Sequence, residues 1–193
     1  FAKVFRNGII IESSLGLDSI NACQTIVYDR FDGVEVTEEE LELFRKLSHM
    51  GRTLVIFNDG PVALENDQYT IYNDLSVEEK LSKMDSLVGP IVYIGDSFKD
   101  IELLQKSYVG ISRGGLADSK VVENSDIVLI DAELNKVYET FLISRSMRTT
   151  AIANNVITVL MKLVVLIGVI SFNGFPLWIA ILVEMLVSAT VMY

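Results

Sequence analysis

The chain has one cysteine and one histidine in 193 residues, and it has fewer basic than acidic residues. The single Cys23 excludes an internal disulfide framework and a metal centre built from several cysteines, and it is compatible with a reducing cytoplasm. We expect His49 to be a solvated helix cap rather than a metal ligand. With 16 Lys and Arg against 26 Asp and Glu, the net charge of −10 argues against nucleic acid or an anionic membrane surface as a partner.

Charge is also nearly absent from two apolar segments, residues 151–172 and 177–193, which hold one ionisable residue each, Lys162 and Glu184. Both segments are near the length that a bilayer-spanning helix requires. The short connector at 173–176 predicts a tight hairpin, which places both charges near the middle of the bilayer. A charge there costs at least about 2.5–3.5 kcal/mol, so we expect the two residues to face each other or an ion path. The alternative is a soluble helical hairpin with an internal salt bridge.

The chain is therefore expected to have two parts, a cytoplasmic domain over residues 1–143 and a transmembrane hairpin over residues 144–193. Arg145 and Arg148 precede the first apolar segment, whereas the connector carries no charge, and the positive-inside rule then places the domain in the cytoplasm. The chain begins with Phe1 rather than Met and has no signal peptide before the domain, so we expect a processed or excised piece of a longer protein.

Short apolar runs alternate with amphipathic segments through the first part. The predicted strands are 25–28, 53–57, 69–73, 91–94, 108–111 and 126–130. The predicted helices run from 37 to 50, from 76 onward, over 99–106, from 118 onward, and from the last strand into the membrane. Capping boxes of Thr37 with Glu40 and of Ser76 with Glu79 mark two of the helix starts. This alternation predicts an α/β fold with a Rossmann-like parallel sheet that is covered on both faces.

Acidic side chains follow three of the predicted strands. Asp29, Asn58 with Asp59, and Asp96 stand where strands end, and ligands of parallel sheets bind beyond the carboxyl ends of the strands. Converging carboxylates are costly unless a hard cation neutralises them, so this edge is a candidate Mg²⁺ and phosphoryl site. The alternative is that Asp and Asn follow strands because they favour turns.

From end to end the chain resembles the C-terminal part of the heavy-metal P-type ATPases, and it is most similar to the zinc, cadmium and lead exporters. Thr25 to Asp29 resembles the strand with the phosphorylated aspartate, and Ser76 to Lys80 resembles the segment with the phosphate-sensing lysine. Ile94 to Asp100 resembles the magnesium loop. The apolar segments resemble the last two membrane helices, whose lysine and acid contribute to the transport site.

The resemblance implies a haloacid-dehalogenase-type fold and a multi-pass protein of a prokaryotic plasma membrane. It implies catalytic roles for Asp29, Lys80 and Asp59. It also implies weak Mg²⁺ binding by three carboxylates, Asp29, Asp96 and Asp100. Glu184 would bind a transported cation of the zinc, cadmium, cobalt or lead class, with Lys162 as its countercharge. The partners implied are the membrane and the remaining helices of a pump, or a partner chain that supplies them.

The phosphoryl-binding motifs depart from those of the family. The family's Asp-Lys-Thr-Gly-Thr is Asp29-Arg30-Phe31-Asp32-Gly33 here, and its Thr-Gly-Asp is Phe57-Asn58-Asp59. The Asn of the magnesium loop is Lys99. Each change removes a donor to the phosphoryl group or adds bulk beside it, and such donors are typically worth about 10²–10³-fold in rate. We therefore expect degraded catalysis.

The interval between Asp29 and Phe57 holds one helix, whereas in active pumps it holds the nucleotide-binding domain. ATP is thus not expected as a ligand of this chain alone, because phosphoryl transfer depends on positioning the nucleotide and the metal. We expect part or a degenerate relative of a metal-transporting ATPase. Two alternatives remain. One is a non-catalytic regulatory or assembly subunit of a pump. The other is a small membrane-tethered haloacid-dehalogenase-like phosphatase, because Asp32-Gly33-Val34 resembles part of the motif of that class.

Overall fold

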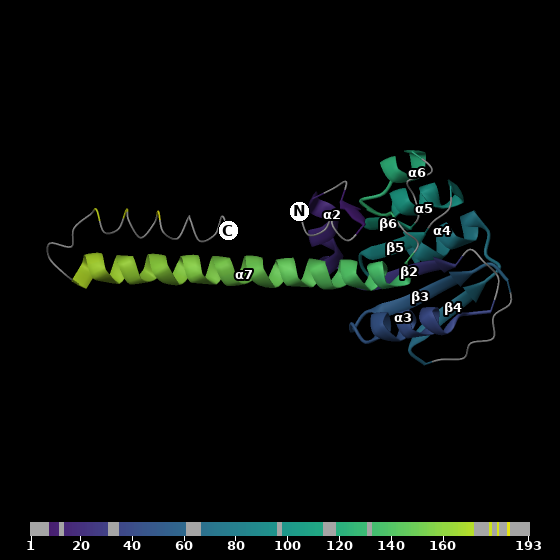
Figure 1. Cartoon of the computed structure of the whole chain (residues 1–193), viewed down its shortest axis with the longest axis horizontal. Helices are drawn as coiled ribbons and strands as arrows, with labels where there is room; N and C mark the ends of the chain where they lie inside the picture. The colour runs from purple at the N-terminus through teal and green to yellow at the C-terminus, as the bar shows by residue number, and fades with distance from the viewer. Residues whose placement is uncertain are drawn as a thin grey trace. The chain divides into compact units, whose positions relative to one another are not determined.

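The computed structural model describes residues 8–11, 14–30, 35–60, 67–95, 98–113, 119–130, 133–171, 178, 181 and 185. Within them, one seven-stranded sheet carries helices around it (Figure 1). The strands are β1 (Ile9–Ile11), β2 (Thr25–Arg30), β3 (Thr53–Asn58), β4 (Tyr69–Asn73), β5 (Ile91–Gly95), β6 (Val109–Arg113) and β7 (Ile127–Leu129). The helices are α2 (Ser14–Ser19), α3 (Glu38–Ser48), α4 (Val77–Asp85), α5 (Ile101–Lys106), α6 (Ser119–Glu123) and α7 (Leu134–Ser171), with short 3-10 helices η1 (Ile20–Ala22) and η2 (Phe98–Asp100).

The strand order is β1-β7-β6-β5-β2-β3-β4. From β7 to β4 neighbouring strands run parallel, and β1 pairs antiparallel with β7, with Ile9 opposite Leu129. Every residue of the inner strands β2 and β5 is buried, because helices cover both faces of such a sheet. The α/β prediction is confirmed, with the antiparallel edge strand β1 as an addition to the expected parallel sheet.

The two helix starts that the sequence marks both carry complete capping boxes. In α3, the Thr37 hydroxyl accepts from the Glu40 amide at 3.2 Å and the Glu40 carboxylate accepts from the Thr37 amide at 3.1 Å. In α4, Ser76 and Glu79 make the same reciprocal pair at 3.3 and 2.8 Å. These bonds satisfy backbone donors that the first helical turn leaves without partners. The exposed His49 is the C-cap of α3.

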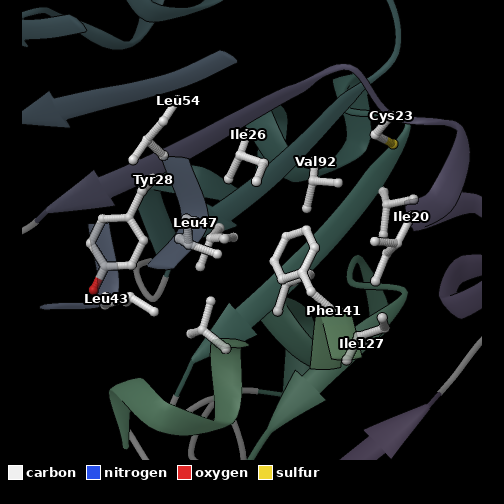
Figure 2. Packing of buried hydrophobic residues seen from close by; sticks show 14 of the residues in the cluster. Ile20, Cys23, Ile26, Tyr28, Leu43, Leu47, Leu54, Val92, Ile127 and Phe141 are labelled. Carbon is white, nitrogen blue, oxygen red and sulfur yellow. The ribbon is translucent and has the colours of Figure 1, made fainter. Parts of the chain in front are cut away.

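Each face of the sheet has its own hydrophobic cluster. The first cluster lies under α2, α3 and the beginning of α7, which contribute Leu17, Phe44 and Phe141 (Figure 2). The second lies under α4, α5 and α6. Because side chains alternate along a strand, the odd-numbered residues of β2 face the second cluster and the even-numbered ones face the first. Asp29 therefore lies on the α4 side of the sheet, and its neighbour Arg30 lies on the α3 side.

Cys23 is part of the first cluster and is a free, buried thiol (Figure 2). Burial raises the pKa of the Cys23 thiol to about 11, against a smaller lowering effect of Arg52. The thiol therefore stays protonated near neutral pH, and a protonated buried thiol is a poor nucleophile. Cys23 packs as a small apolar side chain.

Helix α7 begins beside the last strand and continues without interruption to Ser171. Val137 and Phe141 in its first turns are buried in the soluble part. Among the described residues it is the one helix long and apolar enough to cross a membrane. The chain divides into two compact units, Phe1–Arg145 and Ser146–Tyr193. The second expected span, 177–193, lies almost entirely outside the described residues.

Candidate functional site

The carboxyl ends of the inner parallel strands bring the predicted acidic residues together at one edge of the sheet. Asp29 is near the end of β2, and Asp59 directly follows β3, its neighbour on one side. Gly95 ends β5, the neighbour on the other side. Asp96 lies outside the described residues. The edge arises because parallel strands share one direction, so their ends carry their polar residues to the same place.

A buried ion pair occupies this edge. Lys80 of α4 donates from Nζ to both carboxylate oxygens of Asp29, at 3.0 Å to Oδ1 and 2.9 Å to Oδ2. It also reaches Asp59 Oδ1 at 3.4 Å. The Asp29 and Lys80 side chains are almost completely buried, whereas that of Asp59 is about half exposed. The three residues predicted to be catalytic thus lie in direct contact, and their catalytic role stays a prediction.

Tyr93 completes the contacts of Asp29. Its hydroxyl donates to Asp29 Oδ2 at 2.5 Å, and its ring is fully buried in the second cluster. Asp100 of η2 lies close by, because a Cβ placed on Gly95 would come within 2.6 Å of Asp100 Oδ2 and 2.8 Å of the Tyr93 ring. Only glycine fits at the end of β5 without a shift of these groups.

The surroundings shift the pKa values of Asp29, Lys80 and Tyr93. Burial, followed by the negative charge of Asp100, raises the pKa of Asp29 to about 6, although Lys80 and Tyr93 act in the opposite direction. Burial lowers the pKa of Lys80, but the carboxylates of Asp29, Asp59 and Asp100 together outweigh it, and the pKa lies above its usual value. Burial and the carboxylates of Asp29 and Asp100 hold the pKa of Tyr93 well above its usual range. The phenol therefore remains a hydrogen-bond donor at neutral pH.

The opposite face carries a second polar network around Arg30. The guanidinium binds Glu40 through two hydrogen bonds, Nε to Oε1 at 2.9 Å and Nη2 to Oε2 at 3.0 Å. Its Nη1 donates to Asn58 Oδ1 at 2.8 Å. Since Glu40 also caps α3, the side chain of Arg30 connects the ends of β2 and β3 with the start of α3.

Of the two phenylalanines that replace the family's threonines, Phe57 near the end of β3 is described and Phe31 is not. Phe57 is fully buried on the Asp29 side of the sheet, packs against Tyr72 and has Lys80 Nζ 5.9 Å from its ring centre. A hydrophobic ring thus lies where the resemblance implies a phosphate-binding hydroxyl. Phe31 and Asp32 lie outside the described residues, so the phosphatase-like motif stays a prediction.

The hydrogen bonds described at Asp29 compete with Mg²⁺ for its carboxylate oxygens. Magnesium requires near-octahedral oxygen ligands at short distance, but both oxygens of Asp29 accept from Lys80, and Oδ2 also accepts from Tyr93. Across the described residues, no group of three or more His, Cys, Asp or Glu side chains could hold a metal ion. Weak Mg²⁺ binding by Asp29, Asp96 and Asp100 stays a prediction.

Of the predicted membrane pair, Lys162 is described and Glu184 is not. Lys162 is an exposed residue of α7 within its apolar stretch. Glu184 lies outside the described residues, so the pairing and the metal-binding role remain predictions.

Sequence reasoning missed Tyr93 and Arg30 as members of polar networks. Tyr93 stands in the apolar run Ile91–Gly95, at a position that alternation places on the same face as Asp29. A buried tyrosine hydroxyl normally finds a partner, and that rule was the available signal. For Arg30, the signal was a cation directly after a buried strand, with the glutamate of a capping box ten residues later.

Comparisons with known proteins agree with the resemblance seen in the motifs. No family model matches the chain. The chain is 25% identical over 189 residues to a zinc-transporting ATPase of Synechocystis, covering 86% of this chain and 26% of the relative. It is 29% identical over 197 residues to a cadmium-transporting ATPase of Staphylococcus aureus, covering 96% of this chain and 27% of the relative. The chain thus spans about a quarter of the length of these relatives.

Solved structures show the same fold. A zinc-transporting PIB-type ATPase in its E2.Pi state matches with a TM-score of 0.67 at 19% identity, over 81% of this chain and 27% of the other. The catalytic domain of a CPx-ATPase matches with a TM-score of 0.56 at 14% identity, over 73% of this chain and 98% of the other. The soluble unit has the fold of a P-type ATPase phosphorylation domain. Over most of its length the sequence is similar to the zinc- and cadmium-transporting members of that class, and the predicted resemblance is confirmed.

Proposed function

We propose that this chain is the phosphorylation-type domain and the last two membrane helices of a heavy-metal P-type ATPase, or of a degenerate relative of one, and that it does not form an aspartyl phosphate by itself. The observation that carries the proposal is the position of Asp29. It lies near the carboxyl end of the inner strand β2 of a P-type ATPase phosphorylation fold, and Lys80 donates to both of its carboxylate oxygens. The similarity to a zinc-transporting and a cadmium-transporting ATPase supports zinc and cadmium as candidate cargo.

Loss of ATP-dependent phosphorylation is supported by three features of the same edge. Phe57 brings a buried ring where a hydroxyl donor is expected. The 11 residues of α3 are the one regular element between β2 and β3 among the described residues, so nothing described there resembles a nucleotide-binding domain. Asp29 is engaged by Lys80 and Tyr93. Since phosphoryl transfer depends on positioning and electrostatic stabilisation, these features together remove its basis.

The cargo site that we propose lies in the apolar unit. Glu184 binds a transition-metal cation of the zinc, cadmium, cobalt or lead class, and Lys162 replaces the cation's charge when the metal leaves. The soluble domain, 1–143, is cytoplasmic in this proposal, and the segment 144–193 is a hairpin in a plasma membrane. The remaining membrane helices come from the rest of a longer chain or from a partner.

Metal binding by the full chain in detergent tests this proposal. Zn²⁺ and Cd²⁺ affinities are measured for the parent, Glu184→Gln, Lys162→Met and the control Glu139→Gln, which changes a glutamate in the soluble part of α7. Glu184→Gln is expected to weaken binding by at least about tenfold, since even outer-shell changes cost 10–100-fold. Lys162→Met is expected to tighten binding because a competing cation is removed. Equal affinities in the parent and Glu184→Gln would contradict the assignment of the cargo site.

The carboxylate of Asp29 is occupied by Lys80 and Tyr93, which also suits a second function, that of a non-catalytic regulatory or assembly subunit of a metal pump. Such a subunit needs the fold but not the chemistry. It would bind Zn²⁺ only after it joins a chain that supplies further membrane helices. Metal binding by the isolated chain therefore favours the pump fragment, and binding that requires the added helices favours the subunit.

A further inference from the structure

The hydroxyl of Tyr93 makes a shorter hydrogen bond to Asp29 than Lys80 does, and its effect on metal binding goes beyond the function proposed above. The ring is fully buried among apolar side chains of the second cluster, including Val27 and Leu103. That packing fixes the ring, and the hydroxyl at its tip lies 2.5 Å from Asp29 Oδ2. A buried ring with one polar tip places that tip with little freedom.

The same hydroxyl faces two carboxylates. Asp29 and Asp100 both act on the phenol by charge and by hydrogen bonding. The crowding at Gly95 shows how little room remains, because a Cβ there would meet Asp100 Oδ2 at 2.6 Å and Tyr93 Cε1 at 2.8 Å. The tyrosine hydroxyl is therefore within hydrogen-bonding reach of both carboxylates.

We propose that Tyr93 closes the Asp29 edge against divalent cations by holding its phenolic O–H between Asp29 and Asp100. The proposal rests on the function proposed above only in that these carboxylates are the inherited metal-binding edge. A carboxylate lone pair that accepts a hydrogen bond is not free to bind Mg²⁺, which tolerates little distortion of its ligand shell. Lys80 supplies the positive charge that the cation would otherwise bring.

Removal of the hydroxyl alone should open the edge. Tyr93→Phe keeps the buried ring and removes one of the two hydrogen bonds that Asp29 Oδ2 accepts, while the bond from Lys80 remains. A hydrogen bond to a charged group is worth more than one between neutral groups, so we expect divalent-cation affinity to rise by at least about tenfold. The gain requires Asp29, and adding Asp29→Asn to Tyr93→Phe should remove it.

Tyr28→Phe is the matched control. Tyr28 is also fully buried, lies on the neighbouring strand β2, and has its hydroxyl in contact with Arg113 on the opposite face of the sheet. Its removal deletes a buried phenol without touching Asp29 or Asp100. Mn²⁺ binding to the full chain in detergent is followed through the electron paramagnetic resonance signal of free Mn²⁺, with Mg²⁺ as competitor.

The expected result is tighter Mn²⁺ binding in Tyr93→Phe than in the parent and in Tyr28→Phe, reversed in the Asp29→Asn double variant. A folded Tyr93→Phe that binds Mn²⁺ no more tightly than the parent overturns the proposal, as does a gain that persists without Asp29. If Tyr93→Phe does not fold, Tyr93→Met repeats the test with an apolar side chain that also lacks the hydroxyl. The Zn²⁺ test at Glu184 concerns other residues and another metal, so either proposal can fail alone.

Discussion

The Asp29 carboxylate is surrounded by groups that act on its charge in opposite senses. Burial and the Asp100 carboxylate disfavour the ionised form, whereas Lys80 and the Tyr93 hydroxyl favour it. Burial dominates, so ionisation of Asp29 is less favourable in the folded chain than in the unfolded chain. A carboxyl group with a pKa of about 6 changes charge within the range of pH that a cell can reach.

The first prediction concerns the pH dependence of stability. Because the pKa of Asp29 is raised from 3.8 to about 6 by folding, its contribution is present below about pH 4 and is lost as pH rises through 6. The stability of the parent relative to Asp29→Asn should therefore fall by about 2–2.5 kcal/mol between pH 4 and pH 7, at about 1.4 kcal/mol per pKa unit. Urea unfolding of both proteins in detergent, followed by circular dichroism, measures the difference. A constant difference over this range would show that folding leaves the pKa of Asp29 unchanged, and a rise would show that folding lowers it; either result contradicts the prediction.

The acidic residues at this edge could be predicted from the sequence, but the hydrogen bond of Tyr93 to Asp29 could not. Asp29 and Asp59 follow strands, and parallel strands end together, so their meeting needs no side-chain detail. Lys80 was found through the resemblance of its segment. The contact of Tyr93 with Asp29 depends on how the ring packs between α5 and the sheet, and the strand pattern alone does not determine that packing.

At the scale of elements, the helix starts are the most predictable features of the chain. Both capping boxes are written in residues three apart, so they depend on local geometry. The boundaries of β4 agree with the predicted 69–73. By contrast, β1 consists of three residues whose partner β7 lies more than one hundred residues later, and its pairing depends on tertiary structure. For that reason β1 and α2 were not predicted.

The second prediction compares the two capping glutamates. Glu40 and Glu79 occupy the same position in their helices, but only Glu40 also receives two hydrogen bonds from the buried Arg30. Glu79→Ala should cost about 0.5–1 kcal/mol of unfolding free energy, as expected of a cap. Glu40→Ala should cost more, about 3 kcal/mol, because it also removes an ion pair with two hydrogen bonds from a buried guanidinium. Urea unfolding of the full chain in detergent measures both values. Equal costs would mean that the Arg30 network does not stabilise the fold.

At the scale of the whole molecule, an acidic soluble unit and an apolar unit are joined by one continuous helix, α7. The sequence indicates this division because charged residues nearly disappear after Arg148. The predicted boundary between 143 and 144 stays a prediction, although the compact units meet at the nearby Arg145 and Ser146. The number of spans also stays a prediction, since one such helix is described.

The third prediction concerns the charges of the apolar unit. If Lys162 and Glu184 are partners at one depth, then Lys162→Met and Glu184→Leu should each lower the midpoint of thermal unfolding, because each leaves a charge in hydrocarbon. The double variant should lose less than the sum of the two, since it leaves no unpaired charge. Thermal unfolding in detergent, read from the fluorescence of Trp178 in the same unit, gives the three midpoints. Additive effects would show that the two side chains are not coupled.

The central claim, that the fold of a P-type ATPase phosphorylation domain is kept while its chemistry is lost, is tested most directly by labelling. The full chain in detergent is incubated with ATP labelled at the γ-phosphate, Mg²⁺ and either Zn²⁺ or Cd²⁺, then quenched in acid. The account predicts no acid-stable, hydroxylamine-labile label on the parent chain, as on the control Asp29→Asn. A label present on the parent and absent from Asp29→Asn would contradict it, because Asp29 would then be a working phosphoryl acceptor.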